Sequence, residues 1–241
     1  MKAMSRRALI TSGLAAAGVA GLATANRIAG KHGLIPPDCR GIYGPGETLT
    51  YAAHRLLTRD AMAREFPRSM ISNNPFANEV APPSEQFRKL QAGGFNDWKL
   101  TVDGLVAHPM TLSLADLRSM PTHSQITEVV CEEGWSYVAE WIGTPLSGVL
   151  REAGVLPQAR YLKYFSIQPE WSDSIDIGDA HHPQTFLTMG MNDGDLPVGF
   201  GGPLRLRVPR QLGYKSVKYI TRITATDSMK FQGDYAWFAG I

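Results

Sequence analysis

The sequence predicts one α+β domain that is rich in strands. From Trp98 onward, short apolar or alternating runs that are typical of strands dominate, and only brief helical segments separate them. Hydrophobic residues make up 44% of the 241 residues and charged residues 19%, which indicates a globular chain and excludes a disordered one. The length suits one domain of ordinary or slightly large size.

The N-terminus has the pattern of an export signal over residues 1–25. Arg6 and Arg7 precede an uncharged, mildly apolar stretch, and Ala23-Thr24-Ala25 is a cleavage pattern of small residues. Paired arginines before a weakly apolar run resemble a twin-arginine signal, and a general secretory signal is the alternative. Because the twin-arginine route moves folded proteins, the pattern predicts a periplasmic protein that receives a cofactor before export.

Residues 26–94 are predicted to form an N-terminal arm with one helix. Proline and glycine pairs before residue 47 indicate extended segments and turns. Between Leu49 and Leu57 the apolar residues recur at three-and-four spacing, so we expect a helix over residues 48–66 that ends before Pro67. Residues 68–96 are expected to be loops.

The central domain is predicted over residues 95–227. Residues 99–106 have the pattern of a tight hairpin that turns at Asp103-Gly104. Ser113, with Asp116 three residues later, is typical of the capped start of a short helix. A strand over residues 124–130 then leads to Cys131.

The second half of this domain alternates one helix with several strands. Thr144-Pro145 is expected to begin the helix, with proline at its first position, and Gly154 to end it. We expect an aromatic tail over residues 228–241 to pack on the core. The further strands are predicted over residues 161–168, 185–192, 204–208 and 217–226.

A run of basic residues follows Gly202. The formal net charge is only +2, so the chain as a whole does not have the basic character of a nucleic-acid-binding protein. Arg205 and Arg207 share one side of their strand, and the loop over 213–218 combines backbone N–H groups, a hydroxyl and lysines, as phosphate binding requires. A solvated strand face is the alternative. The run comprises Arg205, Arg207, Arg210, Lys215, Lys218 and Arg222, with no acid before Asp227.

Cys131, at the end of an apolar strand, permits three interpretations. It can be an inert buried cysteine, a partner of Cys39 in a disulfide, or a thiolate ligand of a metal. Zinc is disfavoured because His181 and His182 are adjacent rather than spaced for one tetrahedral site, and no second cysteine is close in sequence.

An ordered set of motifs over about residues 95–227 resembles the sulfite oxidase family of molybdopterin enzymes. The likeness is strongest to the bacterial periplasmic branch that includes protein-methionine-sulfoxide reductase. It implies a mixed, strand-rich sulfite-oxidase-type fold. The motifs are Cys131-x-x-x-Trp135-Ser136, Trp141-x-Gly143-x-Pro145-Leu146, His182-Pro183-x-Thr185, Met191-Asn192, Leu196-Pro197, Gly202-Pro203-Leu204-Arg205-Leu206, Val208-Pro209 and Gly213-x-Lys215-x-x-Lys218.

The resemblance implies a role for individual residues. Cys131 matches the single protein ligand to molybdenum, and Arg205 matches the arginine that binds the phosphate end of the pterin. Phe200 departs from the pattern, because relatives often have His or Asn there. The other implied cofactor contacts are Asn73, Phe76, Ser166, Ser216, Val217 and Lys218.

The resemblance also implies an activity: two-electron oxo transfer by a molybdenum-molybdopterin oxidoreductase, for example on a sulfoxide. Arg207 or Arg210 is a candidate to orient the substrate. No motif for a second redox centre follows, so electrons are expected to pass to or from another protein, such as a membrane b-type cytochrome. Oxidation of sulfite or another small anion is the first alternative. A cofactor-free periplasmic binding protein on the same fold is the second.

Overall fold

The computed structural model describes residues 49, 52–53, 56–78, 81–82, 84–168 and 171–227. The chain divides into two compact units, Met1–Ala61 and Met62–Ile241, and each is described by itself. The predicted export signal, Cys39 and the aromatic tail lie outside the described residues. No helix in the described part has the length and hydropathy that crossing a membrane requires.

The helix predicted over 48–66 is wrong at its C-terminal end. Described helical residues in this stretch reach only Thr58. Glu65 instead forms an antiparallel bridge with Thr127, and the N–H of Phe66 donates to the carbonyl of Ile126 at 2.9 Å. Pro67 disfavours a helical conformation for the residue before it, so pairing with a strand prevails over the apolar spacing.

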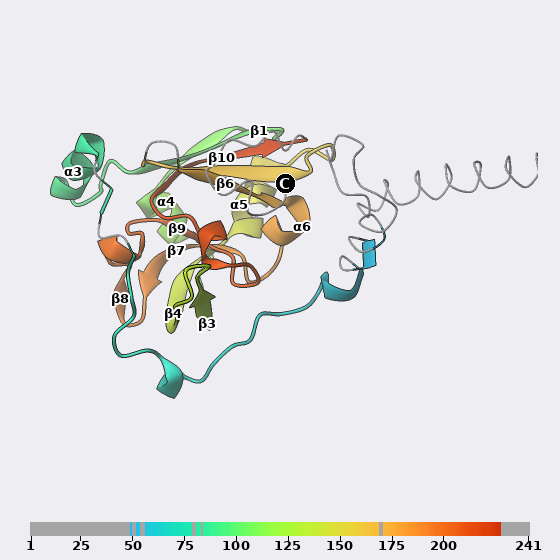
Figure 1. The fold of residues 1–241 in the computed structure, drawn as a ribbon. Helices are drawn as coiled ribbons and strands as arrows, with labels where there is room; N and C mark the ends of the chain where they lie inside the picture. The colour runs from blue at the N-terminus through green and yellow to red at the C-terminus, as the bar shows by residue number, and fades with distance from the viewer. Residues whose placement is uncertain are drawn as a thin grey trace, which may run out of the picture. The chain divides into compact units, whose positions relative to one another are not determined.

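Two five-stranded sheets form the second unit (Figure 1). The first has the order β2-β1-β10-β5-β6, in which only the pairing of β1 with β10 is parallel. This pair joins strands that are more than a hundred residues apart in sequence. The strands are β1 (Lys99–Gly104), β2 (Met110–Ser113), β5 (Tyr161–Ser166), β6 (Ser172–Asp176) and β10 (Ile220–Thr226).

The second sheet is antiparallel and has the order β3-β4-β7-β8, with β9 paired to β7. Its longest pairing is the β3–β4 hairpin, which runs in register from His123↔Gly143 to Val130↔Ser136. The residues between Val130 and Ser136 therefore form a loop at the end of the hairpin. The strands are β3 (His123–Val130), β4 (Ser136–Pro145), β7 (Phe186–Met191), β8 (Gly194–Asp195) and β9 (Arg205–Arg207).

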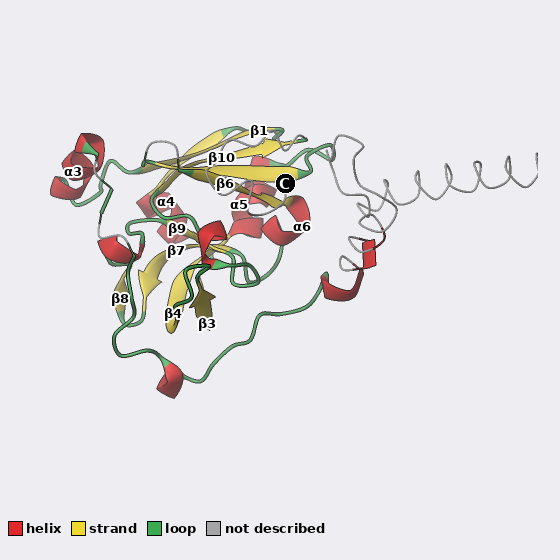
Figure 2. Ribbon diagram, in the orientation of Figure 1, coloured by secondary structure: helices red, strands yellow, loops and turns green. Residues whose placement is uncertain are grey.

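Short helices fill the space between the two sheets (Figure 2). Helix α4 (Leu114–Ser119) contacts both β2 and β4, α5 (Leu146–Ala153) contacts β4 and β7, and α6 (Ile177–Ala180) contacts β5 and β6. Their apolar faces join a core that includes the buried residues of the first sheet. A smaller, aromatic core lies on the second sheet, around Tyr137 and Trp141. Helix α3 (Glu85–Ala92) and the 3₁₀ turns η1 (Arg68–Met70), η2 (Val198–Phe200) and η3 (Gly213–Lys215) complete the fold.

Several predicted elements are confirmed, with changed boundaries. Ser113 and Asp116 form a reciprocal capping box at the start of α4. The tight hairpin predicted over residues 99–106 is wrong, because Asp103 and Gly104 belong to β1 and residues 105–109 connect β1 to its antiparallel partner β2. Helix α5 ends at Gly154, which adopts a left-handed conformation, and Pro145 precedes the helix as its N-cap.

Strand β4, helix α3 and strand β6 are among the elements that were not predicted. Strand β4 has buried residues on both faces over much of its length, so its sequence lacks the alternation of a half-buried strand. Helix α3 has few apolar residues, and it is held by the Ser84 cap and by the complete burial of Phe87. Strand β6 is a short polar segment, Ser172–Asp176, whose three middle residues are buried at the edge of the first sheet.

Candidate functional site

Cys131 lies at the turn of the β3–β4 hairpin. Its N–H donates to the carbonyl of Trp135 at 2.9 Å, and its own carbonyl accepts from the N–H of Gly134 at 3.1 Å. Gly134 has a φ of +91°, a conformation that a side chain would disfavour. The hairpin thus fixes the backbone of Cys131. The residue is a free thiol with 7% of its surface exposed.

Two carboxylates border this thiol. The Cys131 Sγ lies 3.5 Å from Oε2 of Glu132 and 3.9 Å from Oε2 of Glu133. Burial, together with the charge of Glu132, raises the pKa of the Cys131 thiol from 9.0 to about 11. Without a bound metal the sulfur is therefore protonated at neutral pH. A cation that binds here must displace the proton, which is the usual behaviour of a thiolate ligand.

The loop that begins at η3 packs against the cysteine. A Cβ on Gly213 would lie 3.2 Å from the carbonyl oxygen of Val130 and 3.6 Å from the Cα of Cys131. This approach is possible because residue 213 has no side chain. The loop is also tied to β6, because Lys215 Nζ donates to Asp173 Oδ1 at 2.6 Å in a buried ion pair.

Two arginines of β9 hold the next residue of this loop. Arg205 Nε donates to the Ser216 carbonyl at 2.8 Å, and Arg207 Nη1 donates to the Ser216 hydroxyl at 3.2 Å. Both guanidinium groups lie over the ring of Trp141, at 5.4 Å and 5.2 Å from its centroid. The prediction that these arginines share one side of their strand is confirmed. The alternative of a solvated strand face is wrong for both, because they are buried.

A segment of the N-terminal arm borders the site on the side of β4 and Lys218. The N–H of Ser72 donates to the carbonyl of Val138 at 2.9 Å, which ties the arm to β4. Further along the arm, Asn78 Oδ1 accepts from Lys218 Nζ at 3.0 Å. Lys218 Nζ also donates to the carbonyl of Gly199 at 2.8 Å, so it bridges the arm and the turn at η2.

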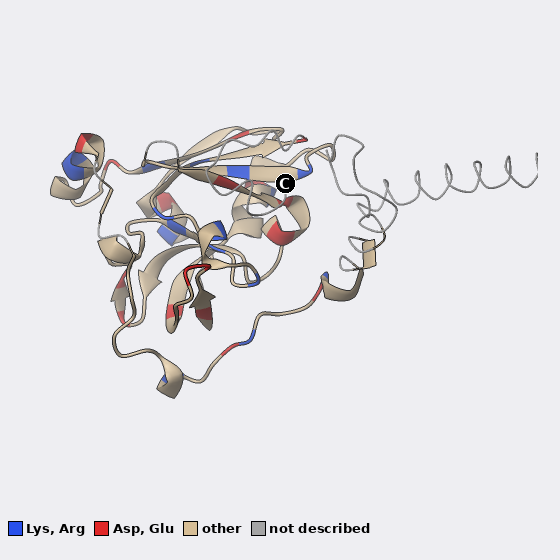
Figure 3. Cartoon of the chain, in the orientation of Figure 1, with Lys and Arg blue, Asp and Glu red and all other residues tan. Residues whose placement is uncertain are grey.

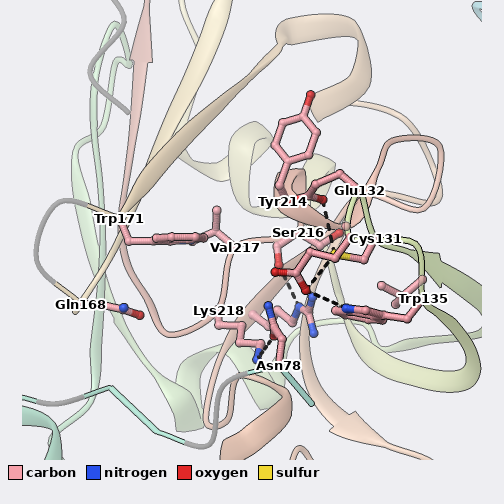
Figure 4. Close-up of a pocket in the computed structure, with 14 residues that line it drawn as sticks. Asn78, Cys131, Glu132, Trp135, Gln168, Trp171, Tyr214, Ser216, Val217 and Lys218 are labelled. Atoms are coloured by element: carbon pink, nitrogen blue, oxygen red, sulfur yellow. Dashed lines mark hydrogen bonds between the residues drawn. The ribbon is translucent and has the colours of Figure 1, made fainter. Parts of the chain in front are cut away.

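These parts enclose a cavity of about 220 Å³ that opens beside Cys131 (Figure 4). Trp171 and Gln168 lie on the opposite side of the cavity from Cys131 and Trp135. Acidic and basic positions meet in the loops that border it (Figure 3). The cavity is lined by Asn78, Val129, Cys131, Glu132, Glu133, Trp135, Gln168, Trp171, Arg205, Gly213, Tyr214, Ser216, Val217 and Lys218.

The structure brings together five of the eight residues expected at the site: Cys131, Arg205, Ser216, Val217 and Lys218. The other three lie outside the lining. The Ser166 hydroxyl accepts from the N–H of Gln168 at 3.0 Å, so it supports a lining residue. Phe76 packs edge-on against Trp135, with ring centroids 5.2 Å apart, and Asn73 is exposed on the arm.

The remaining residues singled out in the sequence do not line the cavity. Arg210 pairs with Asp179 at 3.0 Å, and Arg207 lies behind Ser216. Phe200 packs against Tyr137, with ring centroids 5.6 Å apart, and its carbonyl accepts from Arg205 Nη1 at 3.0 Å. The backbone at this position therefore holds a lining arginine, whatever the side chain.

Sequence reasoning missed several lining residues. Glu132 and Glu133 follow the cysteine directly, so their position in the turn was the available signal. Asn78 and Trp171 carried no local signal, because each reaches the cavity from a segment distant in sequence. Asn78 is 140 residues from its partner Lys218.

Comparison with known proteins decides which family this site represents. The profile of the oxidoreductase molybdopterin-binding domain matches residues 88–234. The chain belongs to this family. The match begins within α3 and covers every element from β1 to β10, so the expected strand-rich molybdopterin-binding fold is confirmed. The protein is a molybdenum-dependent oxidoreductase, and its cofactor is molybdenum-molybdopterin.

The chain is similar to proteins that are named as subunits of protein-methionine-sulfoxide reductase. A putative protein-methionine-sulfoxide reductase subunit from Azospira oryzae is 35% identical over 190 residues, which cover 77% of this chain and 70% of the relative. A protein-methionine-sulfoxide reductase catalytic subunit from Ralstonia nicotianae is 34% identical over 145 residues, or 54% of this chain and 44% of the relative. The chain thus spans about half the length of such catalytic subunits.

A solved structure shares the fold. The sulfane dehydrogenase SoxCD from Paracoccus pantotrophus superposes with a TM-score of 0.53 at 25% identity. The aligned part covers 55% of this chain and 39% of that chain. The fold is therefore shared with a protein named as a sulfane dehydrogenase.

The residues around the cavity fit a molybdenum-pterin cofactor. A soft sulfur donor opens onto one wall, where a metal that changes oxidation state can bind. A hydroxyl and the cations Arg205 and Lys218 line the adjacent wall, where a phosphate can bind. Two carboxylates lie beside the sulfur, whereas the hydrogen bonds of Arg205 among the described residues go to backbone carbonyls, so its charge can bind an anion.

Proposed function

We propose that this oxidoreductase reduces a sulfoxide in the periplasm by two-electron oxo transfer at a molybdenum ligated by Cys131. Support for the substrate class comes from two sources. The sequence relatives are named as methionine-sulfoxide reductase subunits. The local chemistry also favours an uncharged substrate, since two carboxylates border the sulfur that would bind the metal.

In this proposal the cofactor lies in the cavity described above. Cys131 supplies the protein's ligand to molybdenum, and Arg205, Ser216, Val217 and Lys218 bind the phosphate end of the pterin. Ser166 contributes through Gln168, while Asn73 and Phe76 contribute from the arm near Trp135. When bound, the cofactor supplies a metal that exchanges two electrons and an oxygen atom with the substrate.

The residues beside the metal position have defined tasks. Glu132 is the nearest carboxylate to the Cys131 Sγ, at 3.5 Å, so it accepts the thiol proton that leaves when the sulfur ionises. Glu133 Oε2 accepts from Trp135 Nε1 at 2.7 Å, which fixes both the carboxylate and the indole at the mouth. The indole and Phe76 give that mouth an apolar wall for an organic group.

The charge near Cys131 is the observation that favours a sulfoxide over sulfite. Reduction of a sulfoxide consumes two electrons and two protons and yields a thioether and water. The substrate is neutral throughout, and carboxylates can deliver the protons. Sulfite is an anion, and it would approach Glu132 and Glu133 against their charge.

The electrons need a second protein in this proposal. The relatives are named as subunits, which supports a reductase that works with a partner, and a membrane b-type cytochrome suits this role. Export by the twin-arginine route would place the loaded enzyme beside such a cytochrome. Replacing Arg6 and Arg7 by lysines tests the route: loaded protein should accumulate in the cytoplasm, and unchanged export would refute it.

Oxidation of sulfite or another small anion is the second candidate, which the likeness to sulfane dehydrogenase favours. Protein expressed in a molybdopterin-competent host should reduce methionine sulfoxide with a reduced dye as donor. Turnover of sulfite with ferricyanide, without sulfoxide turnover, would favour the second candidate instead. Well-folded protein from the same host that contains neither molybdenum nor pterin would favour a cofactor-free binding protein.

A further inference from the structure

Arg207 is a buried cation that has no carboxylate partner in the part of the chain that the structure describes. Its side chain is fully buried, with 0% of its surface exposed. Among the described residues its donors reach only neutral groups: the Ser216 hydroxyl at 3.2 Å, the Thr127 hydroxyl at 3.3 Å and the Glu128 carbonyl at 2.5 Å. The Nε atom has no hydrogen-bond partner among these residues. A buried charge in such surroundings is costly unless an anion compensates it.

A second uncompensated cation lies beside it. Arg205, 4% exposed, also donates only to carbonyl groups within the described segments, those of Phe200 and Ser216. The nearby basic residues differ, because Lys215 pairs with Asp173 and Arg210 pairs with Asp179. Burial, and secondarily the charge of Arg205, lowers the pKa of Arg207 to about 9. The fold thus concentrates positive charge behind one wall of the cavity.

The contacts of Arg207 connect the cavity wall that presents the Cys131 sulfur with the wall that presents Arg205 and Ser216. Thr127 and Glu128 belong to β3, which leads to Cys131, and Ser216 belongs to the loop that lines the adjacent wall. Arg207 itself does not line the cavity, whereas Arg205 and Ser216 do. Its charge therefore acts on the cavity at short range without direct contact, through the buried Ser216.

We propose that Arg207 is the buried counter-charge of the anionic pterin cofactor, acting through Ser216 and β3 so that the protein is fully stabilised only when the cofactor is bound. This inference rests on the proposed position of the cofactor. It assigns Arg207 a positioning and electrostatic role, in contrast to Arg205, which contacts the ligand. It also explains why a guanidinium rather than an apolar side chain is buried against Trp141.

The test compares melting temperatures of cofactor-free and cofactor-loaded protein, obtained from molybdopterin-deficient and molybdopterin-competent hosts. Arg207→Gln removes the charge and leaves an amide donor, and Arg207→Lys keeps the charge. For Arg207→Gln we expect the melting temperature of the loaded protein to fall by more than that of the cofactor-free protein. Loss of molybdenum on dialysis should be about tenfold faster, the scale of a typical coupling between two sites. Arg207→Lys should retain most of the stabilisation by cofactor.

Arg222→Met is the matched control, because Arg222 lies on β10, is half exposed and pairs with Asp103. It should leave the cofactor-induced rise in melting temperature unchanged. Equal losses by the loaded and cofactor-free forms of Arg207→Gln, or a cofactor-free form that fails to fold, would overturn the inference, as would a lysine variant that behaves like the glutamine variant. Absence of bound molybdopterin in the unmodified protein would refute the proposed function itself.

Discussion

Gly213 lies so close to Cys131 that a Cβ on the glycine would sit 3.6 Å from the cysteine Cα and 3.2 Å from the Val130 carbonyl oxygen. This contact joins the two halves of the site, the turn that presents sulfur and the loop that presents phosphate-binding groups. The distance between them is therefore set by backbone packing rather than by flexible side chains.

Gly213→Ala is expected to push the loop and the cysteine turn apart by a few tenths of an ångström, because the new Cβ would lie too close to the Val130 carbonyl oxygen. We predict a lower molybdenum content per purified protein, with unfolding destabilised by only about 1 kcal/mol. Gly148→Ala is the control. A Cβ on this α5 glycine meets nothing within 4 Å, so alanine should stabilise the helix by up to about 1 kcal/mol and leave molybdenum content unchanged. Equal molybdenum contents in both variants would show that the contact does not set the site.

The buried pair of Lys215 and Asp173 is expected to stabilise the loop over 213–218. Lys215→Met leaves the Asp173 carboxylate buried without a cation and should lower the free energy of unfolding by about 3 to 5 kcal/mol. Adding Asp173→Asn should recover much of that loss, which urea titration can measure. Lys89→Met removes an exposed helix pair and should cost about 0.3 to 0.5 kcal/mol. Similar losses for the two lysine variants would contradict a structural role for the buried pair.

Alkylation of Cys131 in cofactor-free protein is expected to depend steeply on pH. Burial raises the pKa of this thiol to about 11, and only the thiolate reacts, so iodoacetamide should react slowly at pH 8. The rate should increase about tenfold per pH unit up to about pH 11. The same shift implies that cofactor-free protein loses stability as pH rises through that pKa, because the unfolded chain releases the proton first. A rate that levels off near pH 9 would refute the shift.

The arm is expected to loosen in acid. The hydrogen bond from Ser124, and secondarily the ion pair with Arg68, lower the pKa of Glu140 on β4 below 4.5. A lowered pKa contributes stability that is present above about pH 4.5 and disappears as pH falls through the folded-state value. Glu140→Gln should therefore cost about 1 kcal/mol at pH 7 and much less near pH 3, by thermal unfolding. An equal cost at both pH values would exclude Glu140 as the titrating group.

Local signals were sufficient for the core of the site. An apolar strand that ends at Cys131 and a loop of lysines and a serine after Gly213 were both predictable, because strand periodicity and loop chemistry are encoded within a few residues. The alternation at Arg205 and Arg207 also correctly placed both on one face. The burial of the two arginines was not predictable, because the aromatic cluster around Trp141 that covers their face comes from other strands.

Other parts of the site depend on contacts between distant segments. Asn78 reaches Lys218 across 140 residues, whereas the family resemblance had implied Asn73. Strand β4 escaped prediction because it is covered on both faces, which removes the alternation that identifies a half-buried strand. Phe66 and Glu65 lost their predicted helix to pairing with β3, a competition that no local window contains.

The central claim is that Cys131 supplies the protein's sulfur ligand to molybdenum. X-ray absorption at the molybdenum edge, recorded on loaded wild-type protein and on Cys131→Ser loaded in the same host, tests it most directly. The account predicts that the variant has one fewer sulfur neighbour around molybdenum, no oxo-transfer activity and an unchanged fold by circular dichroism. An identical sulfur count in the two proteins, or full activity of the variant, would contradict it.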